Sequence, residues 1–103
     1  MLIKITVVKK TLNSDLAEEY LVNKAGTCEA FSEGQQFFVD DNFRKPEGFC
    51  DWAWTDIHKT VTALYTGGNF STGMFESWMK NPNSMIACCT DGIRPVIFKV
   101  ERV

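Results

Sequence analysis

The chain has 103 residues, of which 45% are hydrophobic and 13% aromatic. A chain of this length and composition can build one core without staples, so we expect a single domain over residues 1–103. The net charge of −2, from 11 basic and 13 acidic residues, argues against a surface for nucleic acid or anionic lipid. No stretch approaches the ~20 apolar residues of a membrane span and no export signal is visible, so we expect a cytoplasmic protein.

The N-terminal third of the sequence predicts two strands with a helix between them. Residues 2–8 are rich in β-branched side chains with partial alternation, which indicates a first strand. Ser14 is a suitable N-cap for a short helix that extends to Leu21. A second strand is expected over residues 35–39, after a glycine turn.

The strongest helix signal covers residues 52–66. Its apolar residues recur with the spacing of a buried helical stripe, and they are Trp54, Ile57, Val61 and Leu64. Gly67-Gly68 is expected to end the helix. The loop that follows, residues 69–83, is rich in aromatic side chains, and we expect it to be either a lid over a pocket or a contact with another subunit.

The C-terminus predicts a hairpin with strands over residues 85–90 and 93–100. A turn of two or four residues pairs Ala87 with Val96 and Cys89 with Arg94, and Pro95 then faces outward on an edge strand. The core face of this hairpin is expected to carry Met85, Ala87, Cys89, Val96, Phe98 and Val100. The whole pattern predicts the α+β class: a small, mostly antiparallel sheet with two helices and a C-terminal β-hairpin.

Two cysteines are the candidate reactive groups. Cys50 immediately precedes the long helix, whose unpaired N–H groups and dipole favour a thiolate. The predicted register places Arg94 beside Cys89, where its guanidinium would stabilise a thiolate and hold a substrate carboxylate. Asp91 would anchor that arginine or shape the turn. We therefore predict Cys50 and Cys89 as catalytic residues, with Arg94, Asp91 and Trp54 as substrate-binding residues.

A structural interpretation of these residues stays open. Cys50 lies on the helix face of Trp54 and Ile57, and buried cysteines in apolar company are usually inert. His58, the only histidine, lies about 12 Å along the helix axis from Cys50, so the two cannot form a dyad, and we expect a structural role for it. Cys28, in a loop, receives no role. No C-x-x-C or paired-histidine spacing is present, so a metal site would require cysteines of separate elements to converge.

Three segments resemble a family of uncharacterised small proteins found mainly in anaerobic bacteria and archaea: Gly48-Phe49-Cys50-x-Trp52-Ala53, Gly67-Gly68, and residues 88–98, CCTDGIRPVIF. The resemblance covers nearly the whole chain. It implies one cysteine before the helix and one in the final hairpin, which correspond to Cys50 and Cys89. Residues 71–76 depart from the family pattern as an apparent insertion, which puts in doubt any lid inferred from relatives. The family supplies no activity.

These observations favour a cytoplasmic, thiol-bearing domain that binds a small anionic molecule and is a candidate for transforming it. One alternative is a non-catalytic module that forms a homo-oligomer, or docks on another protein, through residues 70–78. A second alternative is a metal-binding protein with cysteine ligands. The sequence identifies no cofactor and leaves enzyme activity undecided.

Overall fold

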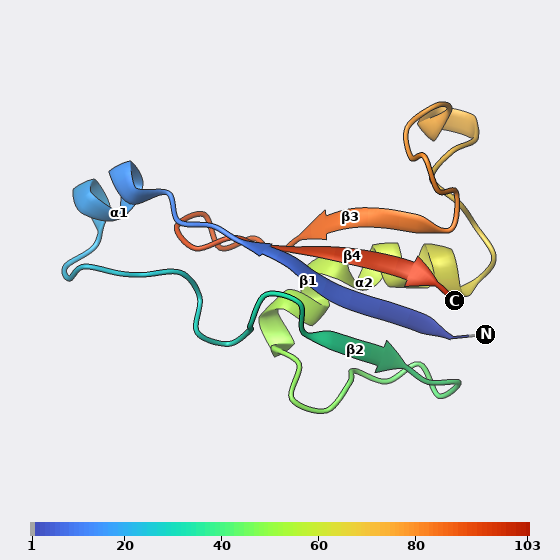
Figure 1. The fold of residues 1–103 in the computed structure, drawn as a ribbon, viewed down its shortest axis with the longest axis horizontal. Coiled ribbons are helices and arrows are strands. Elements are labelled where there is room, and N and C mark those ends of the chain that lie inside the picture. Colours follow the sequence, from blue (N-terminus) through green and yellow to red (C-terminus); the bar gives the residue numbers. More distant parts are fainter. Residues whose placement is uncertain (1) are drawn as a thin grey trace.

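The computed structural model describes residues 2–103, which form four strands, two α-helices and one short 3-10 helix (Figure 1). In chain order the elements are β1 (Ile3–Lys10), α1 (Ser14–Tyr20), β2 (Gln36–Val39), α2 (Asp51–Tyr65), the 3-10 helix Gly73–Phe75, β3 (Ser84–Cys88) and β4 (Val96–Arg102). The predicted α+β class, with an antiparallel sheet, two helices and a C-terminal hairpin, is confirmed. None of the helices in residues 2–103 is both long and apolar enough to cross a bilayer.

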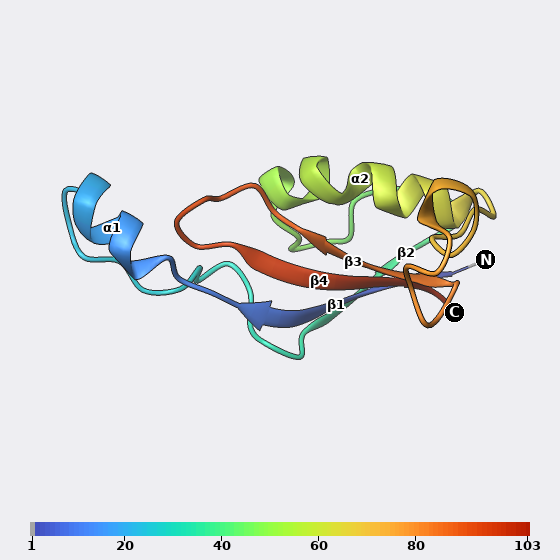
Figure 2. The same ribbon diagram turned by 90° about the horizontal axis from the view of Figure 1, so that it is seen from above.

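The sheet and α2 form two layers (Figure 2). The strand order is β2-β1-β4-β3, and every neighbouring pair is antiparallel. The helix α2 lies along one face of this sheet, whereas the other face carries no helix. The short helix α1 projects from one end of the molecule, and within residues 2–103 it packs against no other helix or strand.

The core lies between the sheet and α2. Alternate residues of the two central strands and one stripe of α2 are fully buried, namely Ile3, Ile5, Val7, Val96, Phe98, Val100, Ile57, Val61 and Leu64. A strand places every second side chain on one face, and a helix places residues three and four apart on one face. The buried face of the sheet therefore packs against the buried stripe of α2. Burial of each such side chain contributes roughly 1.5–3 kcal/mol.

The C-terminal hairpin has the predicted facing but not the predicted register. Ala87 pairs with Phe98 and Met85 with Val100, so every pair is displaced by two residues from our prediction. A displacement of two leaves each side chain on the same face of a strand. Val96, Phe98 and Val100 therefore still face the core, as expected.

The connection between β3 and β4 covers residues 89–95, which is longer than either turn that we predicted. Pro95 lies before β4, and its carbonyl accepts hydrogen bonds from the N–H and the hydroxyl of Thr11, both at 3.0 Å. The prediction of an edge strand for this proline is wrong, because β4 pairs with strands on both sides. The hairpin connection is thus fastened to the end of β1.

The start of α1 also differs from prediction. Asn13, rather than Ser14, occupies the N-cap position, and its side chain makes no capping hydrogen bond. Instead Asn13 Nδ2 donates to the carbonyl of Gly92 at 2.6 Å, and the Asn13 N–H donates to the carbonyl of Ile93 at 2.8 Å. These bonds tie the base of α1 to the hairpin connection.

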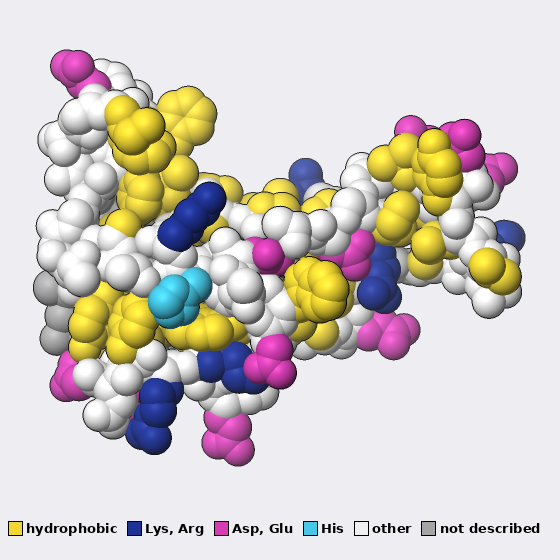
Figure 3. All heavy atoms as spheres, turned by 180° about the vertical axis from the view of Figure 1, so that it is seen from behind, with side chains coloured by type: hydrophobic (Ala, Val, Ile, Leu, Met, Phe, Trp, Pro, Cys, Tyr) yellow, Lys and Arg dark blue, Asp and Glu magenta, His cyan; other side chains and the backbone are white. Residues whose placement is uncertain are grey.

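Arg102 closes the opposite end of the molecule. Its Nη1 donates to the carbonyls of Leu64 at 2.6 Å and Gly68 at 2.8 Å, and its Nη2 donates to Asn83 Oδ1 at 2.5 Å. The last carbonyls of a helix lack partners within the helix, so this arginine caps α2. Residues 69–83 lie beyond that end of α2, and Figure 3 shows hydrophobic side chains gathered there and on the α1 arm.

Candidate functional site

A cleft of about 540 Å³ opens at the N-terminal end of α2. Three parts of the chain form its walls: the segment before β2, the start of α2, and the connection between β3 and β4. The lining residues are Cys28, Ala30, Phe31, Cys50, Trp52, Ala53, Cys89, Thr90, Asp91, Arg94 and Val96. The cleft therefore gathers residues that lie far apart in the sequence.

Three of the four cysteines line this cleft, and we call Cys28, Cys50 and Cys89 the cleft thiols. All three are free and half-buried. The two predicted reactive cysteines thus belong to the walls of one solvent-open cleft. Cys28, to which we assigned no role from the sequence, also lines the cleft.

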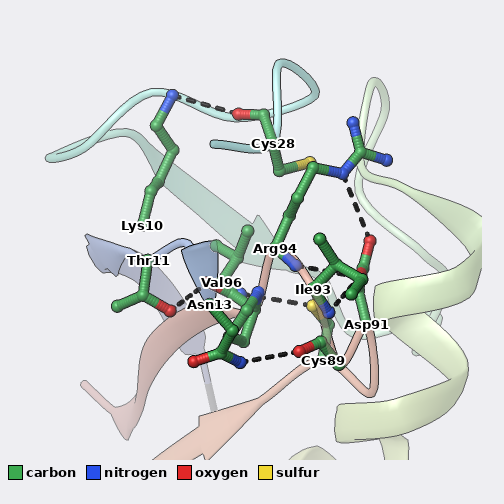
Figure 4. A network of polar contacts seen from close by, with 11 residues as sticks. Lys10, Thr11, Asn13, Cys28, Cys89, Asp91, Ile93, Arg94 and Val96 are labelled. Atoms are coloured by element: carbon green, nitrogen blue, oxygen red, sulfur yellow. Dashed lines mark hydrogen bonds and ion pairs between the residues drawn. The ribbon is translucent and has the colours of Figure 1, made fainter. Parts of the chain in front are cut away.

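The hairpin connection holds Cys89 by both its backbone and its sulfur. The Cys89 N–H donates to the carbonyl of Val96 at 3.1 Å, and the Val96 N–H donates to Cys89 Sγ at 3.3 Å (Figure 4). Cys89 is therefore opposite Val96, and the predicted pairing of Cys89 with Arg94 is wrong. Arg94 instead lies within the connection and reaches the cleft from there.

Asp91 both shapes this connection and anchors Arg94. Its Oδ1 accepts the N–H groups of Ile93 and Arg94, each at 2.9 Å, and its Oδ2 lies 3.4 Å from Arg94 Nε. The hydrogen bond from the Arg94 N–H, with that from the Ile93 N–H and the Arg94 charge, holds the pKa of Asp91 below its ordinary value despite some burial. In Figure 4 the terminal nitrogens of Arg94 point away from Asp91, and among residues 2–103 they have no hydrogen-bond partner.

Asp56 of α2 fixes the position of the hairpin connection. The Thr90 N–H donates to Asp56 Oδ2 at 2.7 Å, and the Thr90 hydroxyl lies 2.9 Å from both carboxylate oxygens. This contact joins the residue after Cys89 to the second turn of the helix that begins beside Cys50. The sequence held no signal for it, because the two residues are 34 positions apart.

The segment before β2 forms a firm wall without regular secondary structure. Lys10 Nζ donates to the carbonyls of Cys28 at 3.0 Å and Phe31 at 2.9 Å. Phe31 is only 3% exposed, and its ring makes edge contacts with Phe37 and Phe98. The hydrogen bonds from the Lys10 side chain and the packing of the Phe31 ring therefore hold this wall in place.

The tryptophan that lines the cleft is Trp52, not the predicted Trp54. Trp52 is 71% exposed. Trp54 packs instead on the other flank of α2, with its ring centroid 5.3 Å from His58, 6.2 Å from Phe49 and 6.3 Å from Phe43. The His58 ring also contacts Phe43 and Trp54, and its side chain is exposed, so the structural role that we expected for it stays a prediction.

Cys88 differs from the cleft thiols in position and in environment. It follows Ala87 in β3, so its side chain lies on the opposite face of the strand, where it is exposed. Desolvation, together with the nearby Cys89 and Asp56 groups, raises the pKa of the Cys88 thiol. Cys88 therefore serves as an internal reference for thiol chemistry outside the cleft.

The loop of residues 69–83 contributes nothing to this cleft. It lies at the other end of α2, so it does not form a lid over this cleft. The described residues, 2–103, contain no group of three or more His, Cys, Asp or Glu side chains that could hold a metal ion.

No family model matches this sequence, and comparisons with curated proteins and with solved structures found no significant match. The resemblance to the family of small anaerobe proteins therefore stays a prediction. The function has to be argued from the cleft itself.

Proposed function

We propose that this protein binds a small anionic molecule in the cleft, with Arg94 as the anion holder and Cys50 and Cys89 as the thiols that act on it. A cytoplasmic setting, in which thiols stay reduced, suits this proposal. Asp91 is then a positioning residue, because it orients the arginine without using its terminal nitrogens.

The observation that carries the proposal is the meeting of thiols and one partly unpaired guanidinium in a single open cleft. Arginine offers two parallel N–H groups on each free edge, and these match the two oxygens of a carboxylate. Cys50 occupies the N-cap position of α2, and its side chain makes no capping hydrogen bond. The helix dipole places the equivalent of about half a positive charge at this end of α2. Both features favour an anion beside the thiols.

The proposal is tested with two alkylating reagents of nearly equal size, iodoacetate and iodoacetamide. In each reaction a thiolate displaces iodide and forms a thioether, and only the charge of the reagent differs. The rate ratio of anionic to neutral reagent cancels the fraction of each thiol that is ionised. We expect this ratio to be about two- to fivefold higher at Cys50 and Cys89 than at Cys88, because Arg94 attracts the anionic reagent although its charge is partly offset by Asp91 and screened by water.

Tandem mass spectrometry separates the four sites, because fragmentation between the adjacent Cys88 and Cys89 localises the label. The Arg94→Gln variant supplies the control. In that variant the ratios at Cys50 and Cys89 should fall, whereas the ratio at Cys88 should not change. Equal ratios at all thiols in the unmodified protein would remove the basis for an anion site.

A second candidate function is self-assembly through residues 70–78. In this segment Met74 is 91% exposed and Trp78 is 66% exposed, which is unusual for side chains of this size. A second copy of the chain would bury them. This candidate concerns the opposite end of the molecule and does not compete with the cleft for residues.

A further inference from the structure

The charges of the cleft indicate how many negative charges its ligand carries. Among the lining residues Arg94 is the only cation and Asp91 the only anion, and they already form an ion pair. Because the pKa of Asp91 is lowered, its carboxylate stays ionised at neutral pH. A monoanion brings one negative charge to this neutral ion pair. A phosphate dianion would bring two negative charges, and both would be repelled by the Asp91 carboxylate. The cleft therefore favours a single carboxylate.

The hydrogen-bonding groups of the cleft indicate what the rest of the ligand is. Apart from the ion pair, the only lining residue with a hydroxyl or amide side chain is Thr90. Its N–H and hydroxyl both donate to Asp56, so neither is free to donate to a ligand. A sugar or a nucleotide would lose hydrogen bonds to water here and gain few in return. The body of the ligand is therefore apolar.

The size of the cleft and the exposed Trp52 define that body further. The cleft volume of about 540 Å³ is within the range that holds a drug-sized ligand. A carboxylate group alone occupies only the volume of one or two water molecules, at about 30 Å³ each. Trp52 lines the cleft, and the residue is 71% exposed. A flat ligand would cover part of this ring by stacking.

From these three observations we infer that the ligand class is an aromatic monocarboxylate. Its carboxylate binds the terminal nitrogens of Arg94, and its ring lies against Trp52, with the exposed Ala30 and the half-buried cleft thiols around it. This inference rests on the proposed function and adds the chemical class of the ligand to it.

The test uses four probes that separate charge from ring: naphthoate, acetate, naphthylmethanol and naphthyl phosphate. Each is titrated against the alkylation of the cleft thiols by iodoacetamide, with Cys88 as the reference site. We expect naphthoate to protect Cys50 and Cys89 at a concentration about tenfold or more below that of the other three probes. Trp52→Ala should weaken this protection about three- to tenfold, which corresponds to loss of one aromatic stacking contact.

The matched control is Trp78→Ala, because Trp78 is similarly exposed but lies at the other end of α2. Protection should be unchanged in this variant. Equal effects of the two tryptophan substitutions would overturn the placement of the ring, and tighter binding of naphthyl phosphate would overturn the single carboxylate.

The remaining outcomes separate this inference from the proposed function. If acetate protects as well as naphthoate, or if no probe protects while the iodoacetate preference persists, the aromatic class is wrong and the anion site stands. If naphthylmethanol protects as well as naphthoate and the iodoacetate preference is absent, both are wrong. If naphthylmethanol matches naphthoate while that preference persists, the carboxylate part of the inference is wrong.

Discussion

The contact between Asp56 and Thr90 should contribute measurably to stability and to the shape of the cleft. Asp56→Ala leaves the Thr90 N–H and hydroxyl without their partner. Hydrogen bonds to a charged group contribute about 1.5–3 kcal/mol when buried, but Thr90 is exposed and water replaces part of the loss. We therefore expect the free energy of unfolding to fall by about 1–2 kcal/mol. For a chain of this length that corresponds to a decrease in Tm of roughly 5–15 °C.

The assay is urea unfolding at equilibrium, with Asp51→Ala as the matched control on the same helix. Asp51 pairs only with Lys45 at the surface, and its side chain is 90% exposed. Such a pair contributes at most about 1 kcal/mol. If Asp56→Ala proves no more destabilising than Asp51→Ala, the contact does not fasten the hairpin connection to α2. As a second readout, Cys89 should be alkylated faster in Asp56→Ala, whereas Cys28 on the opposite wall should not change.

Two further predictions concern the turn and the far end of the molecule. The folded state holds the pKa of Asp91 below its ordinary value of 3.8. The contribution of this carboxylate to stability is therefore present above pH 3.8 and is lost as the pH falls through the lower folded value. Asp91→Asn should show a shallower loss of Tm in acid, and equal slopes of Tm against pH in the two proteins would contradict this. If residues 70–78 mediate self-assembly, light scattering should give the molar mass of a dimer, and Trp78→Ala should lower it. A monomer at every concentration would eliminate that function.

The fold was largely predictable because its core follows simple periodicities. The alternation of β-branched residues in β1 and the helical stripe that ends at Leu64 each predicted an element that the structure contains. The hairpin register was not predictable in the same way. We assumed a short turn, whereas Asp91 organises a longer connection with its side chain and Pro95 has no N–H to extend the ladder.

The candidate site was only partly predictable, because loops and neighbouring elements complete it. Cys50 and Cys89 were marked by their places at a helix start and in a hairpin. Cys28 lies in a segment without periodicity, and only the hydrogen bonds from Lys10 and the anchored Phe31 ring bring it to the cleft. Helical periodicity pointed to Trp54 as the tryptophan near Cys50, yet the cleft opens beside the first turn of α2, where Trp52 lies.

The isolation of α1 has a practical consequence for labelling the protein. A seven-residue helix that packs against no other element gains little from tertiary contacts, so its amide protons should exchange with solvent almost as fast as those of a free peptide. Opening of α1 need not disturb the cleft thiols, because the chain is fastened on both sides of it. Asn13 binds the hairpin connection before α1, and Lys10 Nζ holds the Cys28 carbonyl after it. Exposed positions such as Val22 can therefore carry a spectroscopic reporter or an inserted tag while the cleft keeps its shape.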